Sequence, residues 1–167
     1  MSRKVYLIDT TALIHDVHLN DDVEIFVVEG VLDEAKSLKA KLRTEIILSK
    51  SKIYKPSKEN VTKAIRIAKE LGEHNLTKTD IEIIASALEL SESYGSDLIV
   101  ITDDYSIQNI LSYLNINFKK IATKGISKTI KWINFCPVCK LKFDAKLENC
   151  LNCGSKLIKI KNAVYNP

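Results

Sequence analysis

Four cysteines, the only ones in this chain of 167 residues, constrain its fold more than any other sequence feature. They form two Cys-x-x-Cys pairs, Cys136 with Cys139 and Cys150 with Cys153, separated by ten residues. Each pair places two thiolates on one tight turn, so two turns can close a tetrahedral shell of four sulfurs around Zn²⁺. Such a closed shell is structural rather than catalytic. We therefore expect a small zinc ribbon; the alternative is two disulfides, which an intracellular chain would not keep.

The residue after each cysteine pair bears on the geometry of that turn. Gly154 follows the second pair, where a left-handed backbone would let amides turn towards the sulfurs. Lys140 holds the same position after the first pair, and lysine adopts that backbone conformation less readily.

The cysteine segment is also the most basic part of the chain. Residues 125–167 hold eight lysines and two acids, a net charge of +6, whereas residues 1–124 hold 17 basic and 19 acidic side chains. A module of about forty residues cannot bury enough apolar surface to fold alone, so a metal must supply stability. We expect a domain of residues 1–124, a linker of residues 125–134 and a ribbon of residues 135–167. The positive charge favours a polyanionic partner, although lysines can also simply keep a small module soluble.

Residues 1–124 alternate between predicted strands and helices. Short β-branched runs predict strands at residues 4–8, 23–28 and 98–102, with a weaker candidate at 115–121; periodic segments predict helices at 31–49, 57–71 and 79–94. Strands that are nearly continuous in apolar residues, with helices between them, indicate an α/β fold with a parallel sheet covered on both faces. The functional crevice of such a sheet lies beyond the carboxyl ends of its strands.

Acidic residues gather at that predicted edge. Asp9 ends the first strand, and Asp103 and Asp104 end a later one; Asp80 opens a helix, and Glu34 lies early in another. Several carboxylates at one rim repel one another without a counter-ion, and hard oxygen ligands suit Mg²⁺ or Mn²⁺. Such a metal can activate water and neutralise charge on a phosphodiester during cleavage.

Each acid also has a purely structural interpretation. Asp9, Asp103 or Asp104 can cap a following helix, and Glu34 can lie on a solvated helix face. Thr79 and Glu82 have capping-box spacing, which would make Asp80 a favourable first-turn acid. Taken together, the acids favour chemistry, because helix caps need not come from strand ends that converge.

These motifs resemble those of the PIN-domain ribonucleases. The opening DTTALI, the glutamate of VLDEAKS, the helix LTKTDIEIIASAL and the junction ITDDYSIQNI are similar to the four acidic motifs of that family, in order, across residues 4–121. The resemblance implies a PIN-like sheet flanked by helices and implies Asp9, Glu34, Asp80 and Asp104 as metal ligands, with Asp103 as a neighbour that can share the task. With the zinc ribbon, the chain resembles the archaeal Nin-one-binding family of endonucleases.

That resemblance implies a function. It predicts a metal-dependent endoribonuclease that cleaves single-stranded precursor RNA at the 3′ end of small-subunit ribosomal RNA, within a small ribosomal subunit particle, during ribosome biogenesis. The alternatives are a non-catalytic RNA-binding assembly factor and a toxin-type PIN ribonuclease acting on transfer RNA.

Two groups of basic residues are candidates for gripping RNA. Residues 36–58 carry eight basic side chains and one acid, and the ribbon adds its lysines. The selected candidates are Lys36, Lys39, Arg43, Lys140, Lys142 and Lys146. The first group can equally be the solvated face of an amphipathic helix. Four aromatic residues can stack on bases, but we favour their use in the ribbon's own core: Trp132, Phe135, Phe143 and Tyr165.

The sequence offers few residues or motifs for other kinds of catalysis or binding. The histidines are His15, His18 and His74, so a His15–His18 acid–base pair is conceivable, though solvated polar residues are the simpler interpretation. No GxGxxG or GxxxxGK[ST] motif occurs, which gives no support for a nucleotide cofactor. The apolar run VYLID near the N-terminus is far shorter than a signal peptide or a membrane span, so we expect a cytoplasmic protein with no membrane partner.

Overall fold

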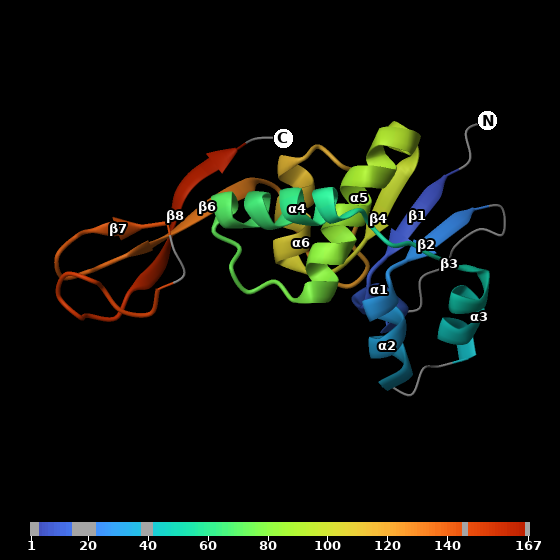
Figure 1. The fold of residues 1–167 in the computed structure, drawn as a ribbon, viewed down its shortest axis with the longest axis horizontal. Helices are drawn as coiled ribbons and strands as arrows, with labels where there is room; N and C mark the ends of the chain where they lie inside the picture. The colour runs from blue at the N-terminus through green and yellow to red at the C-terminus, as the bar shows by residue number, and fades with distance from the viewer. Residues whose placement is uncertain (1–3, 15–22, 38–41, 145–146, 166–167) are drawn as a thin grey trace.

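The computed structural model describes residues 4–14, 23–37, 42–144 and 147–165, without side chains for a few of them (Figure 1). Two sheets organise the chain. The first holds five parallel strands in the order β3-β2-β1-β4-β5, and the second holds three antiparallel strands in the order β7-β6-β8. The predicted α/β architecture with a small cysteine-bearing module is therefore confirmed.

The parallel sheet is built from short strands, of which the three central ones are mostly buried and the two edge strands are exposed or half-buried. They are β1 (Val5–Ile8), β2 (Glu24–Val27), β3 (Lys52–Ile53), β4 (Leu98–Ile101) and β5 (Phe118–Lys119). Side chains of β1 and β4 are mostly buried on both faces, as the continuous apolar runs predict. Strands β1 and β4 pair with Val5 opposite Leu98 and Ile8 opposite Ile101. This register brings the ends of the two central strands to the same edge. The short β3 was not predicted.

Six helices lie in the described part of the first domain. They are α1 (Thr10–Ile14), α2 (Glu29–Ser37), α3 (Leu42–Lys50), α4 (Lys58–Leu71), α5 (Lys78–Tyr94) and α6 (Tyr105–Tyr113), with a short 3₁₀ turn η1 (Gly95–Asp97) after α5. The prediction of one helix over residues 31–49 is wrong at its start, which lies at Glu29, and its residues divide between α2 and α3. Residues 38–41 lie outside the described residues. No helix among the described residues is long and apolar enough to cross a membrane.

A capping box is present at the start of α5, but Thr77 and Asp80 form it, not the predicted Thr79 and Glu82. Thr77, not Thr79, is the N-cap: its hydroxyl accepts a hydrogen bond from the Asp80 amide at 3.2 Å, and the Asp80 carboxylate accepts one from the Thr77 amide at 2.7 Å. Both threonines have an acid three residues later, so local spacing alone could not choose between them. Thr79 instead lies against α2, where a Cβ added at Gly30 would come within 2.3 Å of the Thr79 hydroxyl.

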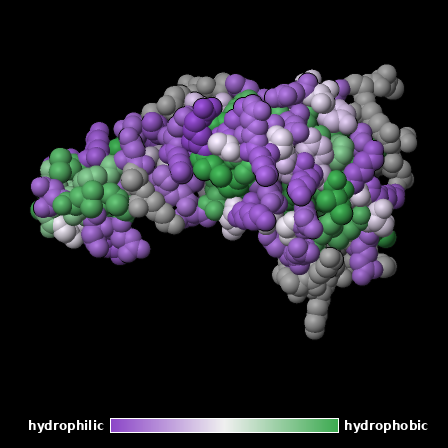
Figure 2. Space-filling model, viewed as in Figure 1, coloured by the Kyte–Doolittle hydropathy of each residue, from purple (hydrophilic) through white to green (hydrophobic). Residues whose placement is uncertain are grey.

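The ribbon consists of β6 (Thr129–Phe135), β7 (Lys142–Phe143) and β8 (Ile158–Tyr165). Most of the segment 125–134, expected to be a linker, is strand: β6 pairs with β8 along its length and leads directly to Cys136. The ribbon points away from the helices in Figure 1, and apolar surface covers its far end in Figure 2. Val138, Leu141 and Leu151 are exposed hydrophobic residues of this module.

Polar side chains of α6 hold the start of β6. The side chain of Asn109 donates to the Ile130 carbonyl at 2.8 Å and accepts from the Ile130 amide at 2.8 Å, as a neighbouring strand would. The side-chain oxygen of Gln108 accepts a hydrogen bond from the Ile126 amide, and the Thr129 hydroxyl donates one to the Ser112 hydroxyl. The ribbon therefore begins on the surface of the first domain.

Candidate active site and metal centre

Asp9 is the most buried acid at the edge of the parallel sheet. It follows β1, is 4% exposed, and accepts hydrogen bonds from the Thr10 amide at 2.6 Å and from the hydroxyls of Thr11 and Thr102 at 2.8 and 2.7 Å. Burial raises the pKa of Asp9; these hydrogen bonds oppose the shift, and the negative charge of Asp80 adds to it. The site therefore holds a carboxylate whose charge favours a nearby cation.

Two threonine hydroxyls tie the end of β1 to the end of β4. The Thr102 hydroxyl, which donates to Asp9, also accepts from the Asp104 amide at 3.0 Å. The Thr11 hydroxyl, which also donates to Asp9, accepts from the Asp103 amide at 3.1 Å. The parallel register of Ile8 with Ile101 makes this possible, because it sets the residues after each strand side by side.

Asp103 and Asp104 are adjacent in the sequence but differ in their surroundings. The Asp103 carboxylate accepts hydrogen bonds from the amides of residues 121, 122 and 123 and from the Thr123 hydroxyl, at 2.9 to 3.2 Å. Burial raises the pKa of Asp103, but these donors outweigh it and hold the pKa below its ordinary value. This carboxylate anchors the segment after β5.

Asp104 keeps one carboxylate oxygen available. As the N-cap of α6, its Oδ1 accepts from the amides of Ser106 and Ile107 at 2.7 and 2.9 Å. Its Oδ2 accepts no hydrogen bond within the described part of the chain. The capping interpretation of Asp104 is thus correct, and it leaves an oxygen free for a second role.

Glu34 and Asp80 reach the same region from two helices. Glu34, exposed on α2, accepts a hydrogen bond from the Thr10 hydroxyl at 2.7 Å, directly beside Asp9. Asp80, half-buried in the first turn of α5, is near enough to influence the pKa of Asp9, although one of its oxygens serves the capping box. The structure therefore gathers Asp9, Glu34, Asp80 and Asp104 at one rim.

The donor set of this rim fits a hard divalent cation. All of its charged groups are carboxylates, and oxygen ligands suit Mg²⁺ or Mn²⁺. Among the described residues, however, only the four cysteines form a close group of three or more potential ligand atoms. The carboxylates are more widely spread, which suits an ion that keeps several of its waters.

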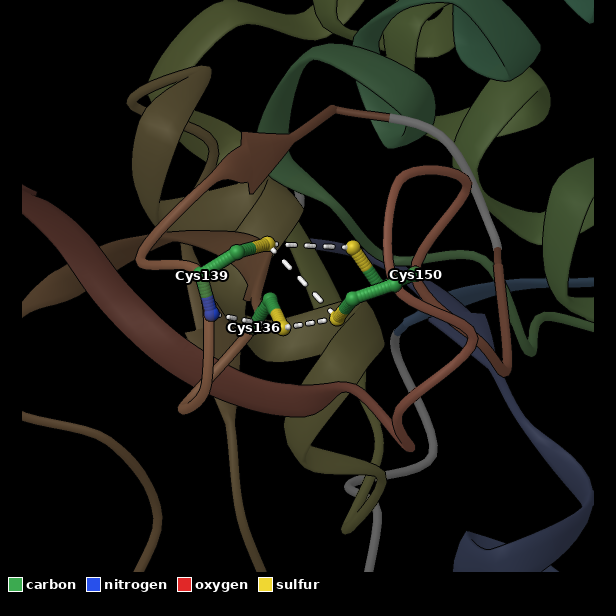
Figure 3. A group of neighbouring side chains, drawn as sticks. Cys136, Cys139 and Cys150 are labelled. Atoms are coloured by element: carbon green, nitrogen blue, oxygen red, sulfur yellow. Dashed lines mark hydrogen bonds between the residues drawn. The ribbon is translucent and has the colours of Figure 1, made fainter.

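The four cysteines converge at the far end of the ribbon (Figure 3). Their sulfur atoms lie within 4.8 Å of one another; Cys136 is 3.4 Å from Cys153, and Cys139 is 3.4 Å from Cys150. A disulfide would need about 2.05 Å, so the four thiols are unlinked, and their spacing suits tetrahedral ligation. Hydrogen bonds from Ser155 are the main cause that lowers the pKa of Cys153 to about 6, which favours the thiolate.

The two cysteine turns have the same backbone geometry despite their different sequences. Gly154 and Lys140 both have a left-handed backbone, with φ of 73° and 63°. Their amides donate to the carbonyls of Cys150 and Cys136 at 2.9 and 3.0 Å. The left-handed backbone is unfavourable for a lysine. The Lys140 ammonium, however, donates to the Pro137 carbonyl at 2.7 Å and so stabilises the same turn.

The candidate RNA-binding residues are only partly described. Lys140 and Lys142 are exposed on the ribbon. Lys39 and Lys146 lie outside the described residues, as do the side chains of Lys36 and Arg43 and the pair His15 and His18. Of the aromatic residues, Phe143 packs on the cysteine cluster, whereas Trp132 is not part of that cluster. The side chain of Tyr165 is not described.

Sequence reasoning missed the residues that organise the rim and the junction. Thr102 gave a weak signal, as a hydroxyl between an apolar strand and two acids. Asn109 and Glu73 gave none, because their partners lie 21 and more residues away in the chain.

The family model and the relatives that match this chain all describe ribonucleases. Residues 6–90 match the family model described as the PIN domain of ribonuclease. The Endoribonuclease Nob1 of Archaeoglobus fulgidus is 32% identical over 95% of this chain and 93% of its own length. The Endoribonuclease Nob1 of Methanocaldococcus jannaschii is 33% identical over 92% of this chain and 76% of its own length. Ribonuclease VapC1 of Thermoplasma acidophilum is 32% identical over 92% of this chain and 76% of its own length. From the fold, the acid rim and these relatives together, the chain belongs to the PIN-domain ribonucleases and, within them, to the Nob1 endoribonucleases.

Proposed function

We propose that this endoribonuclease cleaves single-stranded precursor RNA at the 3′ end of small-subunit ribosomal RNA, in a reaction that depends on Mg²⁺ or Mn²⁺. The observation that carries the metal dependence is the burial of Asp9, whose pKa the negative charge of Asp80 raises further. A buried carboxylate among like charges is costly unless a cation neutralises it. The choice of RNA rests on the resemblance to Nin-one-binding endonucleases and on the Nob1 relatives. We place the reaction in the cytoplasm, within a small-subunit particle.

In this proposal the acids differ in role. Asp9, Glu34, Asp80 and Asp104 hold the cation, while Asp103 fixes the segment 121–123 beside them. Thr11 and Thr102 orient Asp9 by donating to one of its oxygens. When bound, the cation would supply an activated water and neutralise charge on the phosphodiester.

The ribbon has a separate role in the proposal. Its cysteines hold one structural Zn²⁺, and exposed lysines such as Lys142 contact RNA phosphates. Lysine outnumbers arginine in this chain by 22 to three, so grip on the backbone should dominate over bidentate reading of bases.

A toxin-type PIN ribonuclease acting on transfer RNA is the second candidate from the family resemblance, and one relative carries the name Ribonuclease VapC1, which states no substrate. That match spans 155 residues and therefore includes part of the ribbon, so the name alone does not separate the two substrates.

The test offers the purified protein two RNAs, with and without Mn²⁺: a precursor spanning the 3′ end of the small-subunit RNA, and a pool of transfer RNAs. We expect a single Mn²⁺-dependent cut in the precursor and none in transfer RNA. Preferential cutting of transfer RNA would replace the proposed substrate. Binding without cutting of either RNA under all metal conditions would favour the assembly-factor interpretation.

A further inference from the structure

A cavity of about 290 Å³ opens where the nuclease domain meets the ribbon. Its lining comes from the first turn of α6, including Tyr105 and Ser106, and from the ribbon strands, including Trp132 on β6 and Lys159 on β8. Tyr105 directly follows Asp104 in the sequence, so the cavity begins one residue from the acid rim. Both parts of the chain are needed to form it.

The cavity presents two aromatic side chains that the core does not use. Tyr105 is 51% exposed although it stands at the start of a mostly buried helix. Trp132 is half-buried, belongs to neither apolar cluster of the described residues, and carries the Lys159 ammonium 5.0 Å from its ring centroid. Aromatic faces beside a cation are typical of sites that stack nucleobases next to a phosphate backbone.

A buried carboxylate holds the walls of the cavity in place. Glu73 is 7% exposed and accepts hydrogen bonds from Asn109 at 2.9 Å, Ser106 at 3.1 Å and Lys159 at 3.4 Å. Ser106 is also one of the two residues whose amides Asp104 caps. Glu73 therefore fixes the ribbon's lysine and the start of α6 in one network, which sets the cavity at a constant place relative to the acid rim.

We propose that this cavity is a subsite for one unpaired nucleobase of the RNA strand that is cut, with the base against Tyr105 and Trp132 and its backbone beside Lys159. The proposal rests on the endoribonuclease function and adds a position where the enzyme recognises single-stranded RNA. A base can enter only after leaving its helical stack, so the subsite admits unpaired RNA and excludes a duplex. Stacking is tolerant of base identity, since every base has a π-face.

Trp132 is the only tryptophan of the chain and lines this cavity and a neighbouring one beside Gly72, so its emission reports on the junction, and the Tyr105 variant below makes the test specific to this cavity. The experiment titrates the full-length, zinc-loaded protein, with no added Mg²⁺ or Mn²⁺, with a short single-stranded RNA and with the same RNA annealed to its complement. It follows tryptophan emission and, separately, the anisotropy of a dye on the RNA. We expect single-stranded RNA to quench Trp132 emission and the duplex to leave it unchanged.

Variants of two tyrosines on α6 complete the test. Tyr105→Ala should weaken single-strand binding about 5- to 150-fold, the range for loss of one stacking interaction. Tyr113→Ala, eight residues further along the same helix and absent from the cavity lining, should bind like the unmodified protein. Circular dichroism of each variant checks folding.

Two outcomes would overturn the subsite. One is RNA binding by anisotropy without any change in Trp132 emission; the other is equal affinity of Tyr105→Ala and the unmodified protein. Cleavage of the precursor RNA is measured in parallel with Mn²⁺, so persistence of cleavage in either case would leave the proposed function standing while the subsite fails.

Discussion

The nuclease domain and the ribbon reach a stable fold by opposite means. The first has a continuous core in which residues such as Leu7, Ile84 and Ile107 are fully buried. The ribbon's cluster has only three buried members in the described residues, and two of them are the cysteines Cys136 and Cys150. The nuclease domain can therefore place costly acids at one edge of a stable sheet, whereas the ribbon's ligand group is itself the main part of its core.

The largest effect we expect is on the ribbon, after metal removal. Cys136→Ser or chelation should remove zinc binding worth about 10–16 kcal/mol and unfold the ribbon. We propose that residues 1–124 stay folded. Hydrogen exchange should show loss of protection around the cysteines but retained protection in β1 and β4. Val138→Ala, an exposed change in the same turn, is the control. Freshly reduced protein without one zinc per chain would refute the zinc assignment.

The next effect separates two neighbouring acids of the rim. Asp104→Asn should lower cleavage about 100-fold, since a metal ligand contributes several kcal/mol, while asparagine still caps α6 and preserves stability. Asp103→Asn should instead lower the free energy of unfolding by about 1–3 kcal/mol, because its carboxylate accepts hydrogen bonds from three consecutive amides. Cleavage assays and urea denaturation measure the two effects. Loss of cleavage in Asp103→Asn together with loss of stability in Asp104→Asn would make Asp103 the metal ligand and Asp104 the structural acid.

A smaller effect concerns stability and pH. Burial raises the pKa of Asp9, so the folded state holds that proton more tightly than the unfolded state. Stability of the protein without divalent cation should therefore fall as pH rises from the ordinary carboxyl pKa through the raised value. Above this range, Asp9→Asn should raise Tm, and added Mg²⁺ should raise Tm in the unmodified protein only. Equal Mg²⁺ responses in the two proteins would show that Asp9 does not contact the metal.

The smallest effect concerns the ribbon's surface charge. Lys142→Glu should weaken RNA binding without changing the cleavage rate at saturating enzyme. The slope of log affinity against log salt concentration should become shallower by about one unit, as expected for the loss of one phosphate contact. Lys69→Glu, exposed on α4, is the matched control. Lys140 is less suitable, because its ammonium also binds the Pro137 carbonyl. Equal salt slopes for Lys142→Glu and the unmodified protein would indicate that this lysine serves solubility alone.

Local patterns predicted the parts of this molecule that depend on neighbours in the sequence. Apolar runs identified β1, β2 and β4, and the cysteine spacing predicted a closed sulfur group. The edge where Asp9 and Asp104 meet followed from the rule for parallel strands.

Long-range contacts decided what the sequence could not show. Strand β6 runs through an apparent linker because it pairs with β8 and because the Asn109 side chain, about twenty residues away on α6, binds the Ile130 amide. Asp103 and Asp104 are chemically alike, and their hydrogen-bond donors distinguish them: the amides of residues 121–123 bind Asp103, whereas the first amides of α6 bind Asp104. Trp132 was assigned to the ribbon's core, but it lines the cavity at the junction.

We propose that the acid rim, rather than the ribbon, performs cleavage with a divalent cation. The most direct test compares Asp9→Asn with the unmodified protein on the precursor RNA in Mn²⁺, with RNA affinity measured in parallel. We predict that cleavage is abolished while affinity stays equal or rises, since the variant removes a negative charge near the RNA. Cleavage by Asp9→Asn at the unmodified rate would show that Asp9 takes no part in catalysis and serves only as a helix cap.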